Sequence, residues 1–196
     1  MYTLNSVAGI QYIEFSYSPM TTVIYDSAIM QSQLTVSALV AQGKIKDPDP
    51  FTLSQDNSGF LQASAAAAVQ SAFNLMAQLS RDLAIGIGQA VTEFDVANDW
   101  IKIRIGSKST INDASLSVWD SAIQQYLISY ILRDWYGIFI PENNADLPIK
   151  MKALFDIAWA RSISDMSWLT VGTVESARVS LEEGMYEYID EVIVLK

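Results

Sequence analysis

Carboxylates are the only acid–base groups that this chain carries in quantity. The 196 residues include 22 Asp and Glu but no His and no Cys. These absences exclude imidazole and thiol catalysis, together with the usual ligands of zinc, haem and iron–sulfur clusters. What remains for the chain acting alone is carboxylate, lysine or tyrosine chemistry, or a role without catalysis.

One group of carboxylates lies next to basic residues, as in nucleases that use a metal ion. Glu93, Asp95 and Asp99 precede an alternating segment that carries Lys102 and Arg104. Carboxylates that converge on one point can hold Mg²⁺. Their order and spacing match no nuclease motif, so we expect a solvated loop leading into an edge strand. Alanine at any of these acids should then change stability by no more than about 0.5 kcal/mol.

The other candidate motifs have simpler explanations. Gly86 and Gly88 lack the third glycine of a dinucleotide-binding fingerprint, because position 91 is Val, and no Gly-Lys-Ser/Thr triplet occurs. Further acids are interpreted as a turn residue, a helix cap and a hydrated helix face: Glu142, then Asp146, then Glu182, Glu183 and Glu187. We therefore predict no catalytic, cofactor-binding or metal-binding residue, no cofactor and no enzyme activity.

The composition is unusually apolar for a chain without a membrane segment. Hydrophobic residues make up 51% and charged residues 17%, and no run approaches the 18 or so apolar residues of a spanning helix. We expect no membrane partner, and subunit contacts explain the apolarity better than a large monomeric core does. A net charge of −10 with scattered basic residues argues against a protein that grips nucleic acid, although DNA could slide past such a surface.

The N-terminal region, residues 1–43, has two acids and no base. Alternation predicts a strand over 11–17, β-prone residues predict a second strand over 21–25, and 28–41 is ambiguous between helix and strand. The region forms either a small sheet that covers the helical part or an arm that pairs with a neighbouring subunit. An arm predicts that deleting 1–43 leaves a folded core that no longer assembles. Prolines then mark 44–50 as an exposed loop.

Helical periodicity dominates the rest of the chain. It predicts a long helix from Ser58, a helix over 112–136 followed by Gly137, a third helix capped by Asp146, and a final helix from Thr173. A half-buried strand is expected over 100–105, ending at Gly106. The predicted apolar faces are Val69, Ala72, Met76, Leu79 and Leu83; Leu116, Trp119, Ile123, Leu127, Tyr130 and Ile131; Met151, Leu154, Phe155, Ala158 and Trp159; and Val174, Ala177, Leu181, Met185, Tyr188 and Ile189.

These segments predict a mainly α fold, a bundle of three to four helices with a small β element and an N-terminal extended or β region. We expect an N-terminal arm and linker over 1–57 and a helical core domain over 58–196, with its short strand near 100–105. The Ala-rich stretch 65–68 should allow close helix approach.

The plan over residues 58–165 resembles the neck or connector ring proteins of tailed bacteriophages, including those of crAss-like phages. The resemblance lies in the long helix from Ser58, the helix ending in Asp134-Trp-Tyr-Gly137, Phe155 with Trp159 four residues later, and the poorly charged N-terminus. It implies a virion protein assembled in the host cytoplasm as a homo-oligomeric ring. Such a ring connects portal to tail, contacts other neck, portal or tail proteins, and lines a channel through which DNA passes transiently and without specificity.

Two other classes of function stay open. A non-viral assembly or adaptor protein would share the helical core but would not need an arm that reaches another subunit. A carboxylate-dependent metal enzyme would need its acids to converge in one pocket. If a DNA channel exists, the face formed by Glu182, Glu183 and Glu187 is our candidate for its wall, with an outward hydrated surface as the alternative.

Overall fold

The computed structural model describes residues 2–7, 10–79, 91–107, 113–139 and 146–170. Strands β1 (Tyr2–Val7) and β2 (Ile10–Tyr17) are followed by a π-helical turn, η1 (Thr21–Tyr25), and helix α1 (Asp26–Ala41). Short 3-10 turns over Asp49–Phe51 and Gln55–Asn57 lead to α2 (Ser58–Leu79). The described chain then forms β3 (Val91–Asp95), β4 (Trp100–Ser107), α3 (Asp113–Ile138) and α5 (Asp146–Thr170). The expected mainly α architecture with a small sheet is confirmed.

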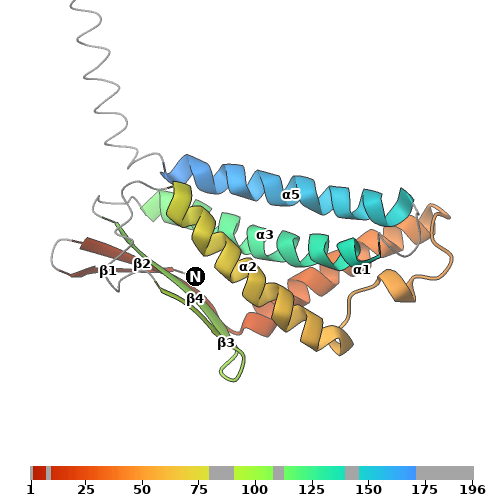
Figure 1. Ribbon diagram of the computed structural model, residues 1–196, viewed down its shortest axis with the longest axis horizontal. Coiled ribbons are helices and arrows are strands. Elements are labelled where there is room, and N and C mark those ends of the chain that lie inside the picture. The colour runs from red at the N-terminus through yellow and green to blue at the C-terminus, as the bar shows by residue number, and fades with distance from the viewer. Residues whose placement is uncertain (1, 8–9, 80–90, 108–112, 140–145, 171–196) are drawn as a thin grey trace, which may run out of the picture.

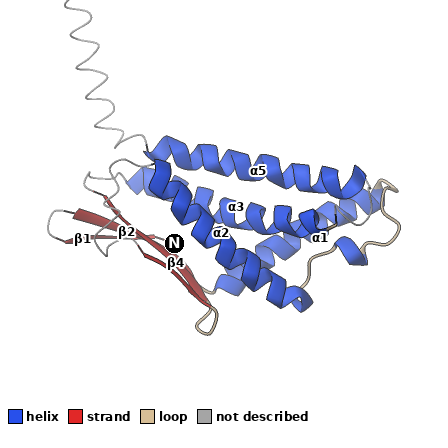
Figure 2. Cartoon of the chain, in the orientation of Figure 1, coloured by secondary structure: helices blue, strands red, loops and turns tan. Residues whose placement is uncertain are grey.

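The four strands form one antiparallel sheet in the order β1-β2-β4-β3. Residues of β2 and β4 alternate between the two faces, so that Ile13, Phe15 and Ile103 are fully buried while Glu14 and Lys102 stay partly exposed. This pattern confirms the half-buried strand expected near 100–105. The sheet lies along one side of the helices, and α5 lies on the side away from it (Figure 1, Figure 2).

Helix α3 is the centre of the helical layer. Its buried residues face the sheet, α2 and α5, which is why they occur on nearly every side of the helix: Leu116, Trp119, Ala122, Ile123, Tyr126, Leu127, Ile128, Ile131, Leu132, Trp135 and Tyr136. The rings of Phe15 and Trp119 lie 6.0 Å apart and join the sheet to α3. Tyr136 stacks on Phe155 of α5 at 5.6 Å. These contacts make sheet and helices share one core.

The alanines of α2 let it approach α3 closely, as expected. Ala65, Ala68 and Ala72 are fully buried, and the Ser71 hydroxyl lies 2.8 Å from the Tyr126 hydroxyl on α3. Val69 and Met76 are buried on the same helix. None of the helices in the described part of the chain is both long and apolar enough to cross a membrane.

The expected strand over residues 21–25 is wrong, because this segment is a helical turn that runs directly into α1. Asp99, from the turn between β3 and β4, accepts hydrogen bonds from the Thr21 amide at 2.9 Å and the Thr21 hydroxyl at 2.6 Å. The Met20 amide donates to the Asp99 carbonyl at 2.9 Å. A carboxylate that satisfies the first amides stabilises a helical start, and here it comes from 78 residues away.

The N-terminal strands belong to the same sheet as β4 within one chain. β2 pairs with β1 on one side and β4 on the other, and its Ile13, Phe15 and Tyr17 are core residues. Of the two alternatives for this region, these contacts match a small sheet that covers the helical part of the same chain, and not an arm that extends from it. Deleting residues 1–43 would leave one edge of β4 unpaired and remove Ile13, Phe15 and Tyr17 from the core, so we no longer expect the deletion to leave a folded core. The division of the chain at residue 57 stays a prediction.

Smaller differences concern the ends of elements and one apolar face. Gly106 and Gly137 each lie one residue inside β4 and α3 instead of following them, and β4 is an interior strand of the sheet, not an edge strand. Leu154, expected on the buried face of α5, is 55% exposed. The helix expected from Thr173, with Glu182, Glu183 and Glu187, lies outside the described residues, as do Leu83, Gly86, Gly88 and Glu142.

Candidate functional site

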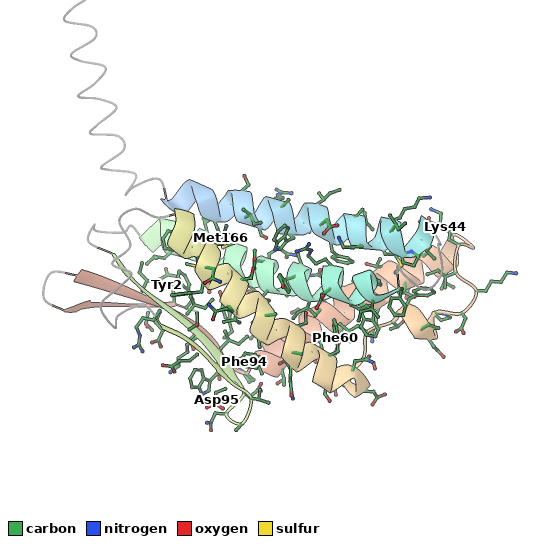
Figure 3. All side chains as sticks on the ribbon, viewed as in Figure 1. Tyr2, Lys44, Phe60, Phe94, Asp95 and Met166 are labelled. Atoms are coloured by element: carbon green, nitrogen blue, oxygen red, sulfur yellow. The ribbon has the colours of Figure 1, made fainter. Side chains whose placement is uncertain are left out.

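The three acids that resembled a metal site have separate structural positions. Asp95 lies at the tip of the β3–β4 hairpin (Figure 3), where its carboxylate accepts hydrogen bonds from the Asn98 amide at 3.0 Å and the Asn98 side chain at 2.7 Å. These bonds lower the pKa of Asp95 below its ordinary value. Asp99 caps η1, and Glu93 pairs in register with Lys102. No three acids of the described residues are grouped so that they could hold a metal ion.

The basic residues of β4 surround a carboxylate of the neighbouring strand. Arg104 donates to one Glu14 oxygen through Nε at 3.0 Å and Nη2 at 2.6 Å. Lys102 Nζ lies 4.0 Å from the other oxygen of Glu14, and the same ammonium lies 4.4 Å from the centre of the Trp100 ring. The basic grouping noted in the sequence is therefore partly neutralised across strands. Each such exposed pair contributes about 1 kcal/mol or less.

A second charged cluster, which sequence reasoning did not find, joins α3 to α5. Asp156 accepts hydrogen bonds from Arg133 Nε at 2.9 Å and Lys152 Nζ at 2.5 Å. The Arg133 guanidinium lies 4.2 Å from the centre of the Trp159 ring and 5.7 Å from that of Tyr130. Partial burial raises the pKa of Asp156, but the bonds and charges of Lys152 and Arg133 outweigh it and leave that pKa lowered.

This cluster borders a shallow groove of about 420 Å³. Tyr130, Arg133, Asp134 and Lys152 contribute its polar lining. Its two cations are already shared by Asp156, so the arrangement is that of a clamp between two helices and not of a prepared anion site. The only part visible in the sequence is the spacing of Lys152 and Asp156, four residues apart on one helix.

The exposed surface of α1 is the feature least expected of a monomeric protein. This helix carries one charged residue, Asp26, in 16 residues. Its inner side contributes Ala28, Ile29, Ser32 and Val36 to the interior. Its outer side exposes Met30 at 55% and Leu34 at 63%, one turn apart, and Val40, at the flank between the outer and inner sides, is 40% exposed. A helix that is apolar on both sides is typical of a buried helix, and an exposed apolar strip is typical of an interaction surface.

The outer edge of β1, at one end of the described sheet, has a related character. β1 lies at one end of the strand order in the described sheet, and its sequence, Tyr-Thr-Leu-Asn-Ser-Val, contains no charged residue. Edge strands of monomeric proteins usually carry lysine, proline or inward charges that discourage pairing with another chain. The opposite edge, β3, carries Glu93 and Asp95. Only β1 of these two edges therefore lacks charge.

No protein-family model matches the chain, and no curated protein or solved structure matches it either. The function must therefore be argued from the chain's own surfaces and charges.

Proposed function

We propose that this chain is a structural subunit of an oligomeric ring in the neck or tail of a tailed bacteriophage. In this proposal the ring connects portal to tail, copies of the chain contact one another and neighbouring virion proteins, and DNA passes through the central channel. The chain would act in the virion after assembly in the host cytoplasm, and it would need no catalytic residue.

The observation that carries the proposal is the outer side of α1. Met30, Leu34 and Val40 are exposed on a helix whose single charged residue is Asp26. Their burial against another subunit would remove apolar surface from water at about 25 cal/mol per Å². The uncharged edge of β1 supports the same conclusion. The net charge of −10 fits a channel that DNA passes without sticking, because like charges repel.

A substitution on α1 tests the proposal. Leu34→Glu places a charge in the proposed interface, and we expect the variant to stay folded but to lose assembly, measured by size-exclusion chromatography with light scattering. Val96→Glu is the matched control, because Val96 is also an exposed aliphatic residue, at 43%, but lies in the β3–β4 turn. Equal assembly of the Leu34→Glu variant and the wild type would refute the role of α1.

A non-viral oligomeric adaptor is the alternative, and the same α1 surface would serve it. Electron microscopy of the native assembly separates the two, because a neck subunit must lie between portal and tail. A carboxylate-dependent metal enzyme is the less favoured alternative, since Glu93, Asp95 and Asp99 have separate hydrogen-bonding and pairing partners.

A further inference from the structure

A groove of about 570 Å³ lies between α3 and α5 and is lined by exposed apolar side chains. Val118 of α3 is 50% exposed, and Leu154 and Ile157 of α5 are 55% and 69% exposed. Arg161 lines the same groove, is exposed, and forms no ion pair with another described residue. Apolar residues gathered beside one cation indicate a docking surface for an apolar segment that carries an acid.

Helix α1 carries a surface with the matching character. Asp26, Met30 and Leu34 are exposed and follow one another at intervals of four residues, so they form one ridge along the outer side of the helix. Asp26 is the single charged residue of α1. We infer that this ridge packs in the α3–α5 groove of a second copy of the chain. The inference rests on the assembly proposed above and names the surface that α1 contacts.

The charges and the apolar residues match in one antiparallel register. With Asp26 beside Arg161 of the second copy, opposite charges face each other. Four residues further along α1 lies Met30, and four residues back along α5 lies Ile157. The ion pair and the apolar contact therefore form together, because four residues span about 6 Å along both helices.

The next contact extends the same register, and the opposite orientation does not fit. Leu34 lies level with Leu154, since eight residues of α1 and seven of α5 span about 12 Å and about 10 Å. A parallel orientation with the same charge pair would instead place Met30 beside Asp165. Burying a carboxylate against an apolar side chain is costly, so the register favours antiparallel packing.

The antiparallel orientation also fits a ring. Within one chain α1 and α5 run in opposite directions, and the end of α1 lies beside the start of α5 (Figure 1), where Leu39 and Met151 line one pocket. Antiparallel packing of α1 on α5 between copies therefore leaves equivalent helices of the two copies pointing the same way. Rotation about an axis along the helices produces this relation, and repeated rotation closes a ring.

Charge reversal tests the proposed ion pair in the full-length chain. Asp26→Arg should weaken assembly by about fivefold in the dissociation concentration, measured by size-exclusion chromatography with light scattering, and adding Arg161→Asp should restore it. Asp26→Arg with Lys46→Asp is the matched control. It has the same net charge, but Lys46 is exposed in the loop after α1, outside both surfaces, so it should not restore assembly. Equal assembly of the two double variants would overturn the inference.

Cysteine cross-linking tests the register, because the chain has no native cysteine. Dissociated ¹⁴N- and ¹⁵N-labelled chains of Leu34→Cys with Leu154→Cys are mixed, assembled and treated with a short bismaleimide. We expect links between the two labels, read by mass spectrometry. Leu34→Cys with Asp165→Cys is the control, because position 165 lies about 16 Å further along the groove, and its yield should be several-fold lower. Links only within one label, or equal yields from the two pairs, would overturn the inference.

The two experiments separate this inference from the proposed function. An assembly that shows neither links between labels nor rescue by charge reversal overturns the α1–groove contact alone. Single chains at every concentration of the unmodified protein overturn both.

Discussion

Removing the Ser32 hydroxyl should lower the free energy of unfolding by much more than the loss of one small polar group would suggest. Ser32 Oγ lies 2.9 Å from the Tyr136 hydroxyl and accepts a hydrogen bond from the Leu53 amide at 3.0 Å. All three residues are fully buried. Ser32→Ala therefore leaves a buried amide and a buried hydroxyl without this partner. Each group left unsatisfied costs about 1–3 kcal/mol, so we expect a loss of about 3 kcal/mol in the free energy of unfolding.

The partner substitution should be milder. In Tyr136→Phe, Ser32 still accepts from Leu53 and can donate to the Phe51 carbonyl 3.5 Å away, so the cost should be about 1 kcal/mol. The double variant removes both hydroxyls and leaves only the Leu53 amide without its partner. It should therefore be no less stable than Ser32→Ala alone, which is a non-additive result.

Urea unfolding followed by tryptophan fluorescence measures these differences. Ser64→Ala is the matched control, because Ser64 is also a buried helical serine but has no hydrogen-bond partner among the described residues. It should be neutral or slightly stabilising. A Ser32→Ala cost no larger than that of Ser64→Ala would refute the reasoning about the buried hydroxyl pair.

Three further predictions concern single side chains. Burial raises the pKa of Tyr136 to about 12 from 10.0, so as the pH rises the unfolded state releases this proton before the folded state does. Between pH 10 and 12 the free energy of unfolding of the wild type should therefore fall by about 2 kcal/mol more than that of Tyr136→Phe, measured by urea unfolding. Asp99→Ala should lower the free energy of unfolding by about 1 kcal/mol because the cap of η1 is lost, whereas Glu93→Ala should lower it by at most about 0.5 kcal/mol. Equal losses for the two variants in thermal unfolding would contradict the capping role of Asp99. Lys152 and Arg133 lower the pKa of Asp156 below 3.8. The ionised Asp156 therefore stabilises the fold above that pH, and this contribution to the free energy of unfolding disappears as acid protonates the folded carboxyl. Asp156→Asn should not show this loss of stability in unfolding curves recorded below pH 4.

Local periodicity was sufficient for the elements whose packing follows their own sequence. α2 begins at Ser58, and α3 and α5 lie within a residue or two of the expected positions, because their apolar residues recur at helical spacing. The strand near 100–105 followed from the alternation of Ile101 and Ile103 with Lys102 and Arg104. Each of these patterns depends only on which face of an element is buried.

Long-range partners determined what the sequence did not reveal. Thr21–Tyr25 is β-prone, yet Asp99 converts it to a helical start from a distant turn. α1 was ambiguous because it is apolar on both sides, so periodicity could not distinguish a helix from a strand. The Arg133–Asp156 pair joins residues on two helices, and no local spacing specifies that contact. The exposure of Leu154 similarly depends on the neighbouring helices and not on α5 itself.

The central claim is that this chain assembles with copies of itself into a closed ring. Electron microscopy of the purified full-length protein tests it most directly, supported by native mass spectrometry to count subunits. We predict closed rings with one subunit number and a central channel, which the Leu34→Glu variant should not form. Single chains at every protein concentration, in images and in mass, would contradict the account.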